Sequence, residues 1–232
     1  MRFAVIRFGG TNCDLDTKYA LQEVCGVDTD LIWYKDDLSR HYDALVLPGG
    51  FSYGDYLRAG AIAARTRIMK DVVAHAKAGG LILGICNGAQ ICAESRLIPG
   101  TFTINAYPKF ICRPSFLRVE NRDTPFTSEF KEGEIIRIPI AHKEGRFVVP
   151  PETLASINRN RQVVFRFCDE RGDPTPGSNP NGSEGNITGI LNETGNILAM
   201  MPHPERASEK ILGSTDGLRI FKSMIKHLGE RR

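Results

Sequence analysis

Features that would mark several other classes of protein are absent from the sequence. The first residues, MRFAVIRFGG, hold a four-residue apolar run, and no stretch approaches the roughly 20 apolar residues that span a membrane. The 30 basic and 27 acidic residues are mixed along the chain, so no basic block indicates a nucleic-acid or membrane surface. There is neither a G-x-x-x-x-G-K-[ST] motif nor a G-x-G, so no nucleotide-binding loop is predicted.

Paired cysteine motifs are missing as well. Six cysteines stand at positions 13, 25, 86, 92, 112 and 168, and no two of them form a C-x-x-C pair. A zinc site is therefore not expected, and we predict that the chain itself binds neither a metal nor a cofactor. With no export signal, the cysteines are predicted to be free thiols in a reducing cytoplasm. Five of them are interpreted as packing residues, and Cys86 alone has a context that indicates chemistry.

What the sequence does contain is an alternation of strand-like and helix-like segments. In the first 100 residues this alternation is the pattern of β-α-β units and a parallel sheet. Beyond residue 100, strand-like runs follow one another with little helix between them, which indicates an antiparallel extension. We predict one α/β domain over residues 1–232, with a mostly parallel central sheet flanked by helices. The expected strands are 2–8, 29–34, 43–47, 81–85, 111–119, 135–140, 163–168, 187–192 and 197–201, and the expected helices are 14–25, 59–78, one from Asn87, and 215–228.

The pentapeptide Gly84-Ile-Cys-Asn-Gly88 follows the apolar run 81–85 and opens a predicted helix. This is the nucleophile-elbow pattern, with cysteine in place of serine. Small residues at both ends of the pentapeptide allow a sharp turn, and the helix N-terminus favours thiolate over thiol at Cys86. A buried structural cysteine between two glycines is the other interpretation of so short a motif. The strand before it and the helix after it favour the nucleophile.

The segment Met200-Met-Pro-His-Pro-Glu205 follows the apolar run 197–201 and offers a base for that nucleophile. Its two prolines are expected to hold the chain extended, so that the side chains of His203 and Glu205 project to the same side. Glu205 would then bind the ring nitrogen of His203 that faces away from Cys86 and stabilise the imidazolium. Taken alone, the segment is equally well a surface turn, and its pairing with the elbow favours the catalytic interpretation.

Pro48-Gly49-Gly50 follows strand 43–47, and two glycines can present main-chain N–H groups without a side chain in the way. We predict an oxyanion hole made by the amides of Gly50 and Asn87, with Gly49 as a further contact to the substrate. An isolated P-G-G is more often a plain turn, so this prediction depends on convergence. In a parallel α/β sheet, functional groups gather beyond the carboxyl ends of the strands. Four loops each follow a predicted strand and should meet there: 9–13, 48–55, 86–88 and 202–205.

The P-G-G turn, the GxCxGxQ motif from Gly84 to Gln90 and the H-P-E segment resemble the class I (triad) glutamine amidotransferases in order and spacing, over essentially the whole chain. The segments FSYGDYLRAG, IPIAHKEGRF, NPNGS and MMPHPERA look like the glutaminase subunits of phosphoribosylformylglycinamidine synthases. Two positions depart from that pattern: Gly9, where proline is usual, and Ala89, where phenylalanine is usual. The resemblance implies a flavodoxin-like fold and a catalytic triad of Cys86, His203 and Glu205.

The resemblance further implies hydrolysis of L-glutamine to glutamate and ammonia through a thioester on Cys86. The ammonia would pass to a synthetase subunit that uses ATP and Mg and converts formylglycinamide ribonucleotide to formylglycinamidine ribonucleotide. That reaction is a carbon–nitrogen ligase step of purine (IMP) biosynthesis. Because one domain is expected to use the whole chain, the nucleotide-handling half must be another polypeptide. A large synthetase subunit and a small adaptor subunit are therefore the implied partners.

Three further features have open interpretations. Gln90 lies four residues after Cys86 on the same helix face, and it either hydrogen-bonds the bound glutamine or is a helix-surface residue. His142 follows a strand and by resemblance lies near the rim of the active site as a substrate contact, although a lone histidine is more often structural. The loop 170–186, rich in Gly, Pro, Asn and Ser, is either a partner contact or a mobile surface loop.

Other functions remain open at this point. The DJ-1 type of cysteine hydrolase shares the elbow but places histidine directly after the cysteine, where this chain has Asn87. A non-catalytic regulatory subunit is a second alternative, and the intact set of Cys86, His203 and Glu205 speaks against it. Glutaminase subunits of other amidotransferases, such as the pyridoxal-phosphate, anthranilate and guanylate types, remain possible in principle.

Overall fold

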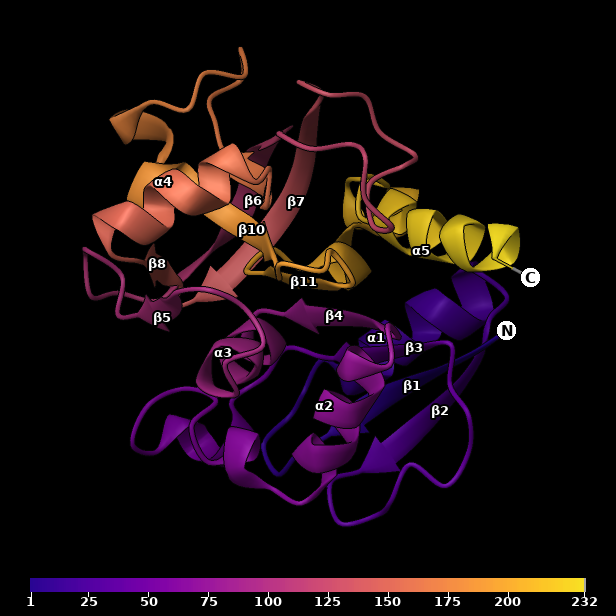
Figure 1. Cartoon of the computed structure of the whole chain (residues 1–232). Coiled ribbons are helices and arrows are strands. Elements are labelled where there is room, and N and C mark those ends of the chain that lie inside the picture. The colour runs from indigo at the N-terminus through magenta and orange to yellow at the C-terminus, as the bar shows by residue number, and fades with distance from the viewer. Residues whose placement is uncertain (232) are drawn as a thin grey trace.

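One nine-stranded sheet runs through the protein in a computed structural model that describes residues 1–231 (Figure 1). Its strand order is β2-β1-β3-β4-β11-β10-β9-β6-β7. The first five strands in this order, β2-β1-β3-β4-β11, pair in parallel, and the remaining pairs are antiparallel. This arrangement confirms the predicted α/β class with an antiparallel extension. The order of the parallel strands is that of flavodoxin-like folds. The strands are β1 (Arg2–Arg7), β2 (Asp28–Trp33), β3 (Ala44–Leu47), β4 (Leu81–Ile85), β6 (Ile111–Val119), β7 (Ile135–His142), β9 (Val163–Phe167), β10 (Ile187–Leu191) and β11 (Ile197–Met200), and a separate pair is formed by β5 (Thr101–Thr103) and β8 (Arg146–Val148).

The central strands are buried on both faces. Every residue of β3, β4 and β11 is buried, because each strand is a continuous apolar run that requires cover on both sides. β7 alternates instead: Ile136, Ile138 and Ile140 are buried, while Ile135 and Arg137 are exposed. This alternation is typical of an antiparallel strand with one covered face.

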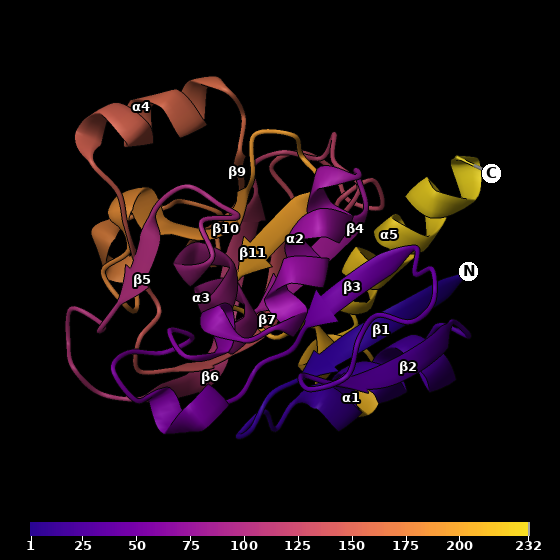
Figure 2. The same cartoon turned by 60° about the horizontal axis from the view of Figure 1, so that its bottom comes forward.

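Helices cover both faces of the parallel half of the sheet. α2 and α3 lie on one face, and α1 and α5 lie on the other (Figures 1 and 2). α3 packs against β3, β4 and β11, behind the strand end that carries Cys86. Among residues 1–231, no helix combines the length and the apolar character needed to cross a bilayer. The helices are α1 (Asp14–Tyr19), which continues as a π-helical turn (Ala20–Val24), α2 (Ile68–Lys77), α3 (Asn87–Glu94), α4 (Pro151–Arg159) and α5 (Leu218–Glu230).

Several predicted boundaries are wrong. The helix predicted over 59–78 begins only at Ile68, because Gly60 adopts a φ of +81° and Thr66 is extended. The closing helix begins three residues later than predicted, after Gly217. The prediction also omitted α4 and the β5–β8 pair. Arg232, the last residue of the predicted domain, lies outside the described residues.

Candidate active site

The loops after β1, β3, β4 and β11 meet at the carboxyl edge of the sheet, where they enclose a small cavity. These four strands are neighbours and pair in parallel, so they end at one edge. The cavity has a volume of about 110 Å³, and its wall includes Cys13, Gly50, Cys86 and His203, one residue from each loop. A larger surface hollow of about 440 Å³ beside Arg96 is lined by neither cysteine nor histidine. The smaller cavity is therefore the candidate site.

Cys86 occupies a strained turn between β4 and α3. Its φ of +50° and ψ of −104° lie in a region that L-residues rarely adopt, and its N–H donates to Met200 O at 2.8 Å. Both flanking glycines are required by close packing. A Cβ on Gly84 would lie 2.9 Å from the carbonyl oxygen of Gly88, and a Cβ on Gly88 would overlap the carbonyl oxygen of Leu47. The turn places Cys86 in the cavity wall, at the N-terminus of α3.

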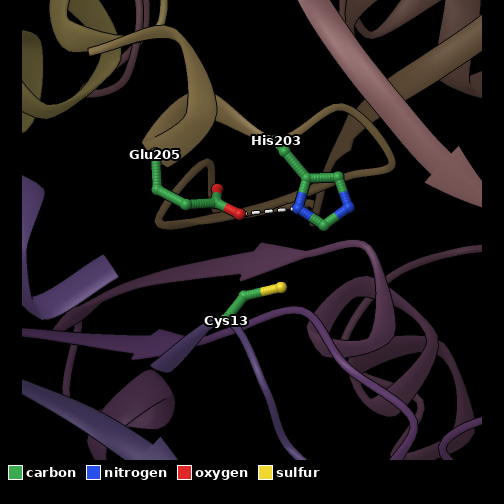
Figure 3. Close-up of side chains that lie close together, drawn as sticks. All are labelled: Cys13, His203 and Glu205. Carbon is green, nitrogen blue, oxygen red and sulfur yellow. Dashed lines mark hydrogen bonds and ion pairs between the residues drawn. The ribbon is translucent and has the colours of Figure 1, made fainter. Parts of the chain in front are cut away.

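His203 and Glu205 form a buried hydrogen-bonded pair just after β11. His203 is extended, and its Nδ1 lies 2.6 Å from Glu205 Oε1 (Figure 3). The extended conformation predicted for the whole segment is wrong beyond His203, because Pro204–Ala207 forms a 3-10 turn with proline at its first position. The turn nevertheless brings the carboxylate beside the imidazole. The side chains of both residues are at most 2% exposed.

The two ring nitrogens of His203 differ in their hydrogen bonds. Nε2 has no hydrogen bond among the described residues, whereas Nδ1 is bound to Glu205. Burial by itself lowers the pKa of His203, but the negative charges of Glu205 and Cys86 outweigh burial and hold this pKa well above its usual value. A protonated imidazole and a cysteine sulfur that share one small cavity can act as a general acid and a nucleophile.

Gly50 and Asn87 are placed where hydrogen-bond donors for an oxyanion are expected. The N–H of Gly50 donates to no protein group in the described chain, and Gly50 lines the cavity with a φ of +151°. Asn87 begins α3, where first-turn N–H groups lack an intrahelical acceptor. Its side chain accepts a hydrogen bond from Ser52 N at 3.2 Å and so ties the elbow to the loop after β3. Gly49 lies behind Gly50, against His203. The oxyanion hole itself stays a prediction.

Gln90 is buried and is not part of the cavity wall. Its Nε2 donates to Glu144 O at 2.6 Å, and its Oε1 accepts from Asn87 Nδ2 at 2.9 Å. Both ends of the amide therefore bind protein groups, and Gln90 is not a helix-surface residue. The contact with glutamine stays a prediction.

His142 belongs to a buried polar network with Asn181 of the Gly-, Pro- and Asn-rich loop. Asn181 Nδ2 donates to Gly145 O at 2.7 Å and its Oδ1 accepts from Ser183 N at 3.1 Å, which fixes the orientation of the amide. The same Nδ2 lies 2.9 Å from His142 Nε2, so Nε2 must accept and the ring proton lies on Nδ1. Burial and the charge of His203 lower the pKa of His142 to about 3, so the ring is neutral. A substrate contact from His142 stays a prediction. The part of the loop around Asn181 is buried and supports His142.

The cavity wall also contains residues that are absent from the predicted site, among them Cys13 and Arg206. Cys13 is buried, as expected of a packing residue, but its sulfur accepts a hydrogen bond from Arg206 Nη2 at 3.0 Å. Arg206 Nε in turn lies 3.7 Å from Glu205 Oε1. Position in the chain is the signal that points to both. Cys13 ends one of the four converging loops, and Arg206 directly follows the H-P-E segment.

Cys13, His203 and Glu205 place a sulfur, a ring nitrogen and a carboxylate oxygen within 4.8 Å of one another, a donor set that zinc accepts. Each of the three side chains already has a polar contact with the protein. Glu205 binds Nδ1 of the imidazole, and the guanidinium of Arg206 donates to the sulfur. A cation there would also lie against the positive charge of Arg206. We therefore assign no metal to this cluster.

Comparison with known proteins shows the family of this chain. The family model described as the CobB/CobQ-like glutamine amidotransferase domain matches residues 1–227. The chain belongs to this glutamine amidotransferase family. The amidotransferase is 57% identical over 230 residues to the phosphoribosylformylglycinamidine synthase subunit PurQ of Methanosarcina acetivorans, with 99% of each chain covered. It is 52% identical over 227 residues to the subunit of that name from Methanocaldococcus jannaschii, with 98% of each covered. A solved structure described as PurLQS from Thermotoga maritima is similar with a TM-score of 0.87, 43% identity and 98% of each chain covered.

The predicted resemblance to glutamine amidotransferases is thereby confirmed, and the alternative of a DJ-1-type hydrolase is wrong. Membership in the amidotransferase family identifies an enzyme of glutamine-dependent amide transfer. The two residues that depart from the expected pattern, Gly9 and Ala89, lie outside the cavity wall. A Cβ on Gly9 would meet only Tyr53 Cε1, at 3.9 Å, and Ala89 is fully buried in α3.

Proposed function

We propose that this chain is the glutaminase subunit of a phosphoribosylformylglycinamidine synthase. It hydrolyses L-glutamine, and the ammonia converts formylglycinamide ribonucleotide to formylglycinamidine ribonucleotide. The observation that carries the proposal is the cavity shared by Cys86 and His203, with Glu205 bound to His203 at 2.6 Å. The full-length relatives named PurQ, more than half identical to this chain, support this choice among amidotransferases.

In the first half of the reaction, Cys86 is the nucleophile. Its thiolate attacks the carboxamide carbon of glutamine, and the N–H groups of Gly50 and Asn87 donate to the oxygen on which negative charge develops. The imidazolium of His203 transfers its Nε2 proton to the nitrogen as the carbon–nitrogen bond breaks. Ammonia leaves, and the glutamyl group remains on Cys86 as a thioester.

In the second half, water attacks the thioester carbon. Neutral His203 takes a proton from this water at Nε2, and the sulfur of Cys86 leaves as thiolate. Glu205 holds Nδ1–H through both halves, so that Nε2 always faces the cavity. Release of glutamate returns the site to the thiolate–imidazolium pair.

The acceptor reaction takes place on another polypeptide. The chain has no nucleotide-binding motif, so ATP and Mg are assigned to a large synthetase subunit. The similar solved structure described as PurLQS supports partnership with that synthetase and with a small adaptor subunit. The six free cysteines support a reducing cytoplasm as the compartment.

Replacing Cys86 by alanine tests the nucleophile. We expect glutamine hydrolysis to fall by several orders of magnitude, as when other catalytic nucleophiles are removed. The reconstituted synthase should still form product from ammonium salt, because the acceptor site lies elsewhere. Cys168→Ala, at a buried cysteine outside the cavity wall, is the matched control and should keep hydrolysis within about twofold. Glutamine-dependent turnover within tenfold of wild type in Cys86→Ala would contradict the assignment.

A further inference from the structure

Cys13 ends the loop after β1 and is anchored to the predicted oxyanion turn. Its N–H donates to Gly49 O at 3.2 Å, and Phe51 N donates to Gly10 O at 3.0 Å beside it. Because the carbonyl and the N–H of a trans peptide point in opposite directions, the bond to Gly49 also sets the direction of the Gly50 N–H. The main chain of Cys13 is therefore held by the turn that offers the oxyanion donor.

The side chain of Cys13 makes two polar contacts. Its sulfur accepts from Arg206 Nη2 at 3.0 Å, and its thiol donates to Asn12 Oδ1 at 3.3 Å. Figure 3 shows the sulfur directed toward the pair of His203 and Glu205. Cys13 is 1% exposed, so these contacts are shielded from water. Both the donor and the acceptor of the thiol are in use.

Arg206 connects this sulfur to the triad. Its side chain is 35% exposed, and its Nε lies 3.7 Å from Glu205 Oε1, the oxygen that binds His203 Nδ1. The second oxygen of Glu205 is buried without a hydrogen-bond partner among the described residues. A buried carboxylate with so few hydrogen bonds is stabilised by a positive charge placed beside it. Because the Arg206 side chain is long and partly exposed, it can move away from Glu205 unless another group holds it. The Cys13 sulfur accepts a hydrogen bond from its guanidinium and so holds it there.

We propose that Cys13 is a positioning residue of the glutaminase site, whose sulfur holds the Arg206 guanidinium beside Glu205 and so keeps the carboxylate on His203. Cys13 acts through Arg206 and forms no bond to the substrate. The catalytic consequence rests on the proposed function. Removing the sulfur should slow the steps in which His203 moves a proton, and it should leave the affinity for glutamine nearly unchanged.

Three substitutions and a control test this link by steady-state glutamine hydrolysis in the complex with the partner subunits. Cys13→Ala removes the sulfur and keeps the N–H, Cys13→Ser keeps a small donor and acceptor, and Arg206→Gln removes the charge. We expect Cys13→Ala and Arg206→Gln each to lower kcat about tenfold, as for the loss of a hydrogen bond to a charged group, with KM within about threefold. Cys13→Ser should restore kcat to within about threefold of wild type, and Cys168→Ala should leave it unchanged. The double variant Cys13→Ala/Arg206→Gln should be no slower than the slower single variant, because both changes break one link.

A second measurement does not depend on turnover. The buried Nδ1–H of His203, bound to Glu205 at 2.6 Å, should give a far-downfield imidazole proton resonance in the NMR spectrum. Cys13→Ala and Arg206→Gln should broaden or remove it, while Cys13→Ser and Cys168→Ala should retain it. If the wild-type complex fails to hydrolyse glutamine, the proposed function is wrong, and the resonance still decides whether Cys13 orders the pair.

Two results would overturn the inference. One is a Cys13→Ala variant whose kcat stays within twofold of wild type and whose resonance is unchanged. The other is equal damage from Cys13→Ser and Cys13→Ala, since the size of the side chain would then matter and not its acceptor. Should Cys13→Ala fail to fold, Arg206→Gln, at a partly exposed side chain, carries both measurements.

Discussion

The backbone of Cys86 is strained, and its neighbours make the strain tolerable. A non-glycine residue in a sparsely populated φ/ψ region costs on the order of 1–3 kcal/mol and persists only where the surrounding packing imposes it. Here the packing consists of the hydrogen bond from Cys86 N to Met200 O and the close approach of Gly88 to Leu47. Strand β4 and helix α3 thus force the thiol into the cavity wall.

Gly88→Ala should destabilise the fold strongly, because the new Cβ would overlap the carbonyl oxygen of Leu47, a main-chain atom inside the sheet. We expect a loss of about 3 kcal/mol or more in the free energy of unfolding, at the upper end of overpacking effects, measured by urea denaturation. Gly229→Ala is the matched control, because a Cβ at this exposed position of α5 meets nothing within 4 Å. It should leave stability unchanged or slightly raised. Similar curves for the two variants would show that α3 does not approach β3 this closely.

Glu205→Gln should impair glutamine hydrolysis less than His203→Ala. Glutamine keeps an oxygen for Nδ1–H but loses the charge that raises the pKa of His203, so we expect a loss of roughly 10- to 10³-fold in kcat. The alkaline limb of the pH–rate profile should move to lower pH in this variant, since the imidazolium loses its proton earlier. Equal or greater damage than from His203→Ala would reject the orienting role of Glu205.

The triad residues are predictable from sequence because each lies in a short motif next to a strand end. Cys86 has a glycine two positions away on either side, and His203 lies between two prolines with Glu205 directly after the second. Cys13 and Arg206 each lie in or beside one of the converging loops, but neither segment predicts that they touch, since their contact joins residues 193 positions apart. Only the parallel pairing of the intervening strands brings them together.

At the scale of elements, the buried strands are predicted best, and the segment 59–78, predicted as one helix, is predicted worst. β3, β4 and β11 fall within one residue of the predicted limits, because a continuous apolar run between polar turns leaves little freedom. The segment around Gly60 reads as helix by propensity. A Cβ at Gly60 would lie 2.8 Å from Ile91 N of α3, so a tertiary contact sets its left-handed conformation and overrides propensity.

The loop from Ser52 to Arg58 stores strain next to the predicted oxyanion turn. Tyr53, Asp55 and Leu57 all have positive φ, although none is glycine. Oδ1 of Asp55 is buried without a partner among the described residues, and burial together with the charge of Glu144 raises the pKa of Asp55 to about 6. A carboxyl whose folded-state pKa is raised binds its proton more tightly in the folded state, so its contribution to stability falls as pH rises from about 4 to 6.

Asp55→Asn should therefore stabilise the protein above pH 6 and have little effect near pH 3.5. Each pKa unit corresponds to about 1.4 kcal/mol, and solvent screening at this half-buried position reduces the effect to about 1–2 kcal/mol at pH 7. Asparagine tolerates the left-handed conformation, so the backbone should be kept. Urea unfolding at the two pH values measures the difference. A gain that is the same at both would show that the carboxyl is not the titrating group.

On the scale of the whole molecule, the antiparallel half of the sheet supports the site and does not merely extend the fold. Pro139 O of β7 accepts from His203 N at 2.8 Å, and Glu144 O, just after β7, accepts from Gln90. The flavodoxin-like half supplies the nucleophile, and the antiparallel half fixes the base. This division was not predictable from sequence, because the extension reads only as a series of strands. All strands except β5 and β8 belong to one sheet, which favours the single domain that the sequence predicts.

Glutamine hydrolysis should wait until a partner subunit is bound. Ammonia released into water would be protonated and lost as a nucleophile, so glutamine would be consumed without product. The Gly49–Gly50 peptide is a suitable gate, since its orientation depends on the hydrogen bond from Cys13 N and a glycine pair can flip at little steric cost. Beside this turn, Tyr56 is 75% exposed and Leu57 91% exposed, so the adjacent loop offers an apolar surface to a partner.

We therefore expect the isolated chain to be a poor glutaminase until its synthetase partner binds. Loss of one oxyanion donor lowers the rate by about 10²–10³, and a partner needs only a few kcal/mol of differential affinity to select the competent orientation. The measurement is kcat/KM for glutamine hydrolysis by the purified chain alone and with synthetase, adaptor and nucleotide substrates added. Leu57→Ser should weaken the activation by these partners, whereas Ile211→Ser, at an equally exposed apolar residue after β11, should not. Equal kcat/KM with and without partners would refute the gate and leave the assignment of Cys86, His203 and Glu205 untouched.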